Sequence, residues 1–95
     1  MKARLIVRER VVYLDGTFVE MVVWQVPTPV PPTQHSFKYR LVYIVDGRRV
    51  LGYDNERGKG DHRHRMGAEE PYVFTTIDAL LEQFVRDVEA MRSCT

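Results

Sequence analysis

Hydrophobic and polar residues alternate along most of the first 54 residues, and this alternation is typical of strands in a half-buried sheet. It predicts four strands, over residues 3–13, 17–26, 36–45 and 48–54. The large apolar residues of the third strand share one face, and they are Phe37, Tyr39, Leu41, Tyr43 and Val45. Asp-Gly pairs at residues 15–16 and 46–47 favour tight hairpin turns. The four strands should therefore form two hairpins.

Two further segments complete the expected fold. Residues 26–33 are rich in proline, so they should form an extended connector between the hairpins. Residues 76–92 repeat apolar side chains at helical spacing, from Ile77 to Met91, which predicts an amphipathic helix. The predicted fold is a single α+β domain over residues 1–95. It has one twisted antiparallel sheet of four to five strands, covered on one face by the C-terminal helix. The fifth strand, a short one, is expected within residues 71–74.

Residues 55–70 break the alternation, because they are polar and contain several glycines. They are predicted to form a long loop, and long loops in small domains often carry function.

Composition places the chain among ordinary globular domains. Of its 95 residues, 44% are hydrophobic and 28% charged, which argues against disorder. Residues 35–65 carry eight basic and four acidic side chains, whereas residues 66–95 carry two basic and six acidic. A single cysteine, Cys94, excludes an internal disulfide and a cysteine-based metal site. The sequence has no signal-peptide pattern and no apolar run of membrane-spanning length, so a cytoplasmic protein without membrane contact is expected.

The basic middle of the chain holds the candidate chemistry, in residues 52–64 (GYDNERGKGDHRH). RNA cleavage without a metal needs a base for the 2′-hydroxyl proton, an acid for the leaving oxygen and cations for the phosphate. Histidine can serve as either base or acid near neutral pH. In this interpretation His62 and His64 are the acid–base pair, and Asp54 or Asp61 orients an imidazole. No cofactor is required.

The expected RNA-binding residues are cationic, polar or aromatic. Phosphate would be held by Lys59, Arg57 and Arg63, with Asn55 beside them, and Tyr53 could stack on an unpaired base. The outer face of the third strand, with Lys38 and Arg40, would extend this basic surface.

Two other interpretations of the same segment stay open. In a strand, residues two apart point to one face, so His62 and His64 could chelate a metal ion, with Asp61 or Asp54 completing the ligand set. The neighbouring arginines disfavour a cation there. Alternatively, the segment is a solvated loop without chemistry. His35 could join the site if the third and fourth strands are neighbours.

Residues 52–64 resemble the hallmark of the TumE-like family of small prokaryotic proteins, which are toxins of toxin–antitoxin modules. Residues 37–43 and the helix that follows residues 72–74 also fit, so the resemblance covers nearly the whole chain. It implies a small antitoxin protein as a partner. The positions that match the motif are Asp54, Asn55, Lys59, Asp61, His62 and His64.

The leading hypothesis is therefore a toxin that acts on RNA, with ribonuclease activity as the expected chemistry. The alternative is a non-enzymatic module whose basic loop binds nucleic acid or an acidic protein, and the third is a small metal-binding protein. An exposed strand edge would also allow a homodimer.

Overall fold

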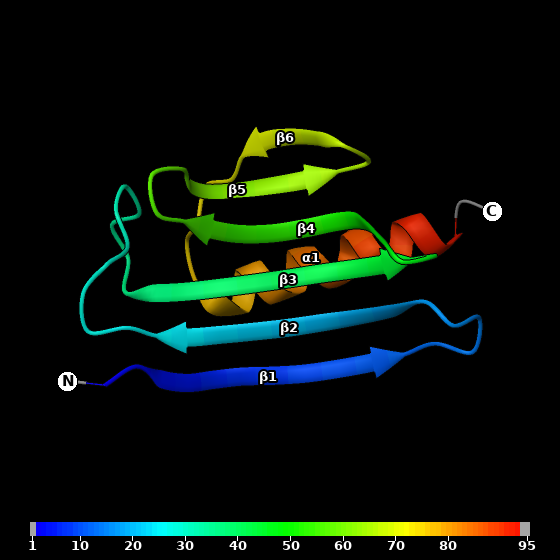
Figure 1. Cartoon of the computed structure of the whole chain (residues 1–95), viewed down its shortest axis with the longest axis horizontal. Helices are drawn as coiled ribbons and strands as arrows, with labels where there is room; N and C mark the ends of the chain where they lie inside the picture. Colours follow the sequence, from blue (N-terminus) through cyan, green and yellow to red (C-terminus); the bar gives the residue numbers. More distant parts are fainter. Residues whose placement is uncertain (1, 94–95) are drawn as a thin grey trace.

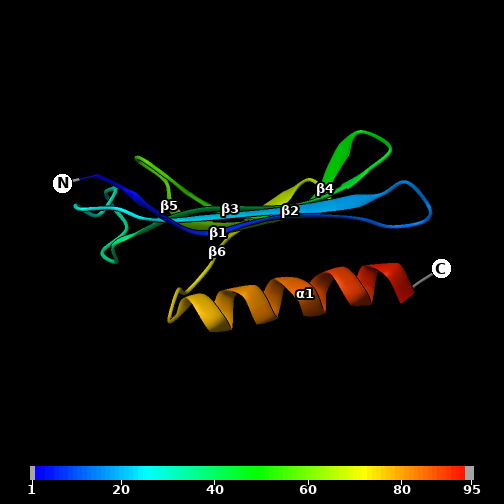
Figure 2. The same cartoon turned by 90° about the horizontal axis from the view of Figure 1, so that it is seen from below.

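A computed structural model describes residues 2–93, which form one open antiparallel sheet of six strands and one helix (Figures 1 and 2). The strands follow each other across the sheet in chain order. Their bounds are β1 Arg4–Val12, β2 Phe18–Gln25, β3 Phe37–Val45, β4 Arg48–Glu56, β5 Gly60–Arg65 and β6 Ala68–Pro71. Helix α1, Ile77–Ser93, lies along one face of the sheet (Figure 2). The α+β class and the C-terminal helix are confirmed.

The predicted strand number was wrong, because the segment expected to be a loop, residues 55–70, contains β5 and β6. The expected short strand within residues 71–74 is instead β6, which ends at Pro71. Strand β5 lacks hydrophobic alternation because both of its faces carry polar or charged side chains. His62 and His64 lie on one face, and Asp61, Arg63 and Arg65 on the other. A pattern search that relies on apolar residues cannot detect such a strand.

Two of the hairpin turns have the positive φ angles that a tight turn requires. Asp46 and Gly47 lie between β3 and β4 with φ of 51° and 75°, as their sequence predicts. Met66 and Gly67 repeat this geometry between β5 and β6, at 50° and 86°. The first Asp-Gly pair instead lies in a longer connection, closed by a hydrogen bond from the Tyr13 N–H to the Thr17 carbonyl oxygen of 2.8 Å.

The hydrophobic core lies between α1 and one face of the sheet. Leu80, Phe84 and Val88 of the helix are buried against the central strands. Thr76 caps the helix, because its hydroxyl oxygen accepts a hydrogen bond from the Ala79 N–H at 3.0 Å. Helix α1 is not of the length and apolar character that a membrane crossing requires, and it is the only helix among residues 2–93.

The opposite face of the sheet has no helix over it (Figure 2). Because successive side chains of a strand alternate between faces, this open face collects every second residue of each strand. The candidate histidines lie on it. Strand β1 forms one edge of the sheet and leaves Leu5, Ile6, Val11 and Val12 exposed.

The proline-rich connector, residues 26–33, links β2 to β3 as predicted, but it is not extended throughout, because the Thr33 N–H donates to the Val30 carbonyl oxygen at 3.0 Å and closes a turn. The connector contacts the turn between β4 and β5. The Gly58 N–H donates to the Pro31 carbonyl oxygen at 2.9 Å. Gly60 has a φ of +76°, and a Cβ atom there would lie 3.1 Å from Cγ of Pro32. Only glycine fits this conformation and contact without strain.

Candidate functional site

Strand pairing brings Asp54, His62 and His64 together on the open face. One transverse row of paired residues crosses all six strands, and it reads Arg8, Val22, Arg40, Asp54, His62 and Pro71. The row beside it reads Arg10, Glu20, Val42, Gly52, His64 and Glu69. Asp54 and His62 are thus direct cross-strand neighbours, and His64 lies two residues further along β5.

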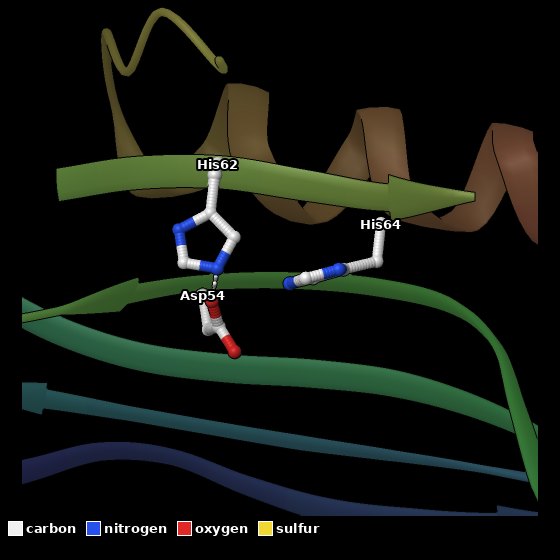
Figure 3. A group of neighbouring side chains, drawn as sticks. All are labelled: Asp54, His62 and His64. Carbon is white, nitrogen blue, oxygen red and sulfur yellow. Dashed lines mark ion pairs between the residues drawn. The ribbon is translucent and has the colours of Figure 1, made fainter. Parts of the chain in front are cut away.

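The side chains of Asp54 and His62 are both deeply buried, with 5% and 3% of the residue surface exposed. Nδ1 of His62 lies 2.9 Å from the Gly60 carbonyl oxygen. Because a carbonyl oxygen only accepts, Nδ1 carries the hydrogen and donates it. Nε2 of His62 then points at Oδ1 of Asp54 and touches it (Figure 3).

This contact is not a well-formed hydrogen bond. Nε2 of His62 and Oδ1 of Asp54 are both buried, and neither has a hydrogen-bond partner among the described residues. Buried polar atoms are nearly always hydrogen-bonded, so two adjacent exceptions mark an unusual site. The second oxygen of Asp54, Oδ2, lies 3.9 Å from Nη1 of Arg49.

His64 completes the cluster. A ligand atom of each of the three side chains lies within 4.8 Å of those of the other two. The His62 and His64 rings meet edge to face, with centroids 4.7 Å apart, and the His64 ring extends from β5 toward the other two side chains (Figure 3). Partial burial, and then the nearby positive charge of Arg49, lower the pKa of His64 below its usual 6.5. Its neutral form therefore predominates at neutral pH.

Cationic side chains surround the cluster on the open face. The Arg49 side chain lies over Gly52, where a Cβ atom would be only 2.9 Å from Cδ of Arg49. Arg40 pairs with Asp54 across β3 and β4, and it is exposed. Lys38, on the same face, donates a hydrogen bond from Nζ to the Asn55 carbonyl oxygen. Lys38 and Arg40 thus lie where the sequence placed them, beside the histidines.

Sequence reasoning missed three contributors to this face. Trp24 was not among the predicted site residues, but it is only half-buried and lines a shallow hollow with Val22, Lys38 and Arg40. Arg49 lies near Asp54 because its side chain crosses Gly52, which has no side chain to block it. Oε1 of Glu69 lies 3.9 Å from Nε2 of His62, and this proximity needs the unpredicted strand β6.

Asp61 lies on the opposite face of β5 from His62 and His64. Its carboxylate accepts hydrogen bonds from Nε2 of His35 and the Tyr39 hydroxyl, both at 2.7 Å, and from Thr33 Oγ1 at 3.2 Å. The Phe74 ring stacks on His35, with centroids 3.8 Å apart. The structure therefore places Asp61 and His35 in a separate group, close to the proline-rich connector.

Three other predicted site residues have partners within the fold. Tyr53 is fully buried, and its hydroxyl donates to Asp87 of α1, so the ring offers no free face to a base. Arg63 lies on the helix face and pairs with Glu70 and with Asp87, the latter at 3.3 Å.

Asn55 is also fully buried. Its side chain accepts from the Tyr39 N–H at 3.0 Å and donates to the Phe37 carbonyl oxygen at 2.7 Å, which ties β4 to β3.

The turn between β4 and β5 carries the last two predicted RNA-binding residues, Arg57 and Lys59, and both are exposed. Nζ of Lys59 lies 3.7 Å from Oε1 of Glu69. Lys59 and Glu69 line a hollow that reaches His62 at the end of the sheet. Lys59 therefore lies close to the cluster, at a hollow that also borders His62.

Comparison with known proteins yields a family match. A family model described as Toxin TumE matches residues 2–92 of the 95-residue chain. No curated protein and no solved structure matches the chain.

Proposed function

The chain belongs to the Toxin TumE family, as a toxin component of a toxin–antitoxin system, and on that premise we propose that it cleaves RNA at Asp54, His62 and His64. The observation that supports this proposal most directly is the set of side chains that surrounds Asp54, His62 and His64. Buried ionisable groups, exposed cations and a half-buried tryptophan share the open face of one sheet. Such a face offers a strand of RNA a reactive centre, phosphate contacts and a stacking surface.

The proposed reaction is attack by the neighbouring 2′-oxygen on phosphorus. The 2′-oxygen–phosphorus bond forms as the bond from phosphorus to the 5′-oxygen breaks. The neutral His64 ring accepts the 2′-hydroxyl proton and, once protonated, delivers it to the 5′-oxygen, so the products are a 2′,3′-cyclic phosphate and a 5′-hydroxyl. Arg40 and Arg49 are the cations closest to Asp54, and they would stabilise charge on the phosphate oxygens.

The proposed roles of the two histidines differ from the symmetric acid–base pair expected from the sequence. Both ring nitrogens of His62 face protein atoms, at Gly60 and Asp54, so His62 has no free nitrogen for RNA. His64 is less buried than His62, and its ring is the one that RNA can reach. His62 and His64 are therefore not two independent acid–base groups. Asp54, His62 and His64 act together, and His64 is the member that contacts RNA.

The direct test incubates purified protein with cellular RNA and maps the ends of the products. We expect cyclic phosphate ends, and a loss of cleavage of roughly 10²–10⁴-fold in Asp54→Asn and His64→Gln. His35→Gln, which removes the third imidazole on the other face, is the matched control and should keep its activity. An inactive wild-type protein, or equal cleavage by the site variants, would refute the proposal.

A non-enzymatic RNA-binding toxin is the second candidate, and the burial of His62 favours it, because a deeply buried imidazole is poorly placed for proton transfer to RNA. The same incubation separates the two candidates. RNA that is bound, released by salt and recovered intact would support the binding module.

A further inference from the structure

We propose that Asp54, His62 and His64 form a binding site for a divalent transition-metal ion of the Zn²⁺ type. The ligand atoms would be Oδ1 of Asp54, Nε2 of His62 and one ring nitrogen of His64. Of the two carboxylates considered from the sequence, the structure brings Asp54 and not Asp61 to the histidines, and the proposal departs from the expectation that no cofactor is needed. The metal site rests on the contacts within the cluster and does not depend on RNA cleavage.

The unpaired atoms of Asp54 and His62 are the first observation. Both side chains are more than nine-tenths buried, and their facing atoms lie within ion-pair distance of each other without the geometry of a hydrogen bond. With the hydrogen of His62 on Nδ1, a nitrogen lone pair faces a carboxylate oxygen at this contact. Leaving a buried polar atom unpaired costs roughly 1–3 kcal/mol, and more for a charged group. A cation bound by both atoms would satisfy the carboxylate oxygen and the nitrogen lone pair together.

The groups behind these atoms are arranged as they are in known metal sites. The Gly60 carbonyl accepts the Nδ1 hydrogen of His62, which leaves the Nε2 lone pair directed at the cluster. Arg49 approaches Oδ2 of Asp54, so Oδ1 is the oxygen that faces His62. A backbone carbonyl behind a ligating histidine, and a partner for the second carboxylate oxygen, are common supports of ligand orientation.

The spacing of the three ligand atoms suits one small ion. They lie within 4.8 Å of one another. Ligands of a tetrahedral ion with bonds of about 2.0–2.1 Å are about 3.4 Å apart. A bound ion would separate the touching atoms of Asp54 and His62 and draw the His64 nitrogen inward, by rotations of side chains on strands that stay paired. Three protein ligands leave the fourth position open, as in catalytic zinc sites.

The charges around the cluster fit a cation better than the sequence suggested. Arg63 and Arg65 were counted against a metal, but they lie on the helix face, 3.3 Å and 3.6 Å from carboxylate oxygens of Asp87. On the open face, the carboxylates of Asp54 and Glu69 face the cluster, and Arg49, Arg40 and Lys38 are the cations that remain near it. Two imidazoles with one carboxylate favour Zn²⁺, Co²⁺ or Ni²⁺ over Mg²⁺ or Ca²⁺.

The test titrates the full chain, free of any histidine tag and carrying Cys94→Ser, with Zn²⁺ in a calorimeter and no RNA present. We expect one Zn²⁺ per chain, and a loss of affinity of roughly 100-fold or more in His62→Gln and in Asp54→Asn. His35→Gln removes an imidazole outside the cluster and should bind Zn²⁺ as the parent protein does. Circular dichroism checks that each variant is folded. His64→Gln changes a less buried residue and tests the site again if a buried substitution unfolds the chain.

The visible spectrum of the Co²⁺-loaded protein provides a second measurement. We expect the intense bands of four- or five-coordinate Co²⁺, lost in His64→Gln and unaffected by excess Mg²⁺. Absence of saturable binding, or unchanged affinity in folded His62→Gln or His64→Gln, would overturn the metal site. A protein that binds Zn²⁺ but leaves RNA intact would refute RNA cleavage alone and keep the metal site.

Discussion

His35 donates a hydrogen bond from Nε2 to Oδ1 of Asp61 at 2.7 Å, on the face of the sheet opposite to that of His62. The tautomer follows from the other ring nitrogen, because Nδ1 of His35 accepts from the Phe37 N–H at 3.2 Å. Both nitrogens of His35 are therefore occupied. Asp61 and His62 are thus adjacent in the sequence but have different roles. Asp61 stabilises the fold, and His62 belongs to the candidate site.

Asp61→Ala should destabilise the protein without removing the candidate chemistry. The substitution leaves three donors, from Thr33, His35 and Tyr39, without their acceptor. We expect the free energy of unfolding to fall by roughly 2–4 kcal/mol, measured in urea. Glu82→Gln on the exposed face of α1 is the control, with a change below about 0.5 kcal/mol. A stable Asp61→Ala protein that has lost RNA cleavage would instead place Asp61 in the site.

Arg40 and Arg63 should differ in RNA binding, although the sequence proposes both as RNA contacts. Arg40 is exposed on the open face, whereas Arg63 pairs with Glu70 and Asp87 on the helix face. Replacing an arginine that contacts phosphate lowers the slope of log affinity against log salt by about 0.7 for single-stranded RNA. We expect this change in Arg40→Gln and none in folded Arg63→Gln, measured by fluorescence anisotropy at several salt concentrations. The reverse result would move the RNA-binding surface to the helix face.

Zn²⁺ should raise the thermal stability of the protein. A ligand that binds only the folded state at 100 times its dissociation constant adds about 2.7 kcal/mol to the free energy of unfolding. For a domain of this size each kcal/mol raises Tm by roughly 4–8 °C, so the expected rise is roughly 10–20 °C. Differential scanning calorimetry with Zn²⁺ and with excess EDTA measures it. The rise should vanish in His62→Gln, and an equal rise in that variant would show that Zn²⁺ binds elsewhere.

The buried tyrosines should make the fold sensitive to alkaline pH. Burial, and then a hydrogen bond to a carboxylate, raise the pKa values of Tyr39 and Tyr53 above their usual value of 10. Above pH 10 the unfolded chain loses these protons while the folded chain retains them. The associated stability is therefore complete below pH 10 and decreases as the pH rises further.

Urea unfolding at pH 9 to 11 measures this loss. Tyr53→Phe removes one of the two hydroxyls, so its unfolding free energy should fall less steeply with pH than that of the wild type. An unchanged steepness in Tyr53→Phe would show that Tyr53 does not contribute.

The strands with an apolar face were predictable because burial on one side of a sheet imposes alternation on the sequence. Phe37 to Val45 carry this alternation, whereas Ile77 to Met91 carry the helical spacing of an amphipathic helix. Both elements lie within one residue of the expected bounds. Strand β5 carries no such signal. Its helix face is held by the ion pairs of Arg63 and Arg65 with Asp87, and ion pairs between distant segments leave no periodic pattern.

The sequence by itself determined that a sheet and one helix form, and that imidazoles, carboxylates and cations are concentrated in residues 52–64. Only the tertiary structure decided which of these residues meet. The alternation of side chains along β4 and β5 sends Asp54, His62 and His64 to the open face, and Tyr53, Asp61 and Arg63 to the helix face. A one-residue shift of the pairing would exchange those partners, and the pairing depends on contacts across the whole sheet.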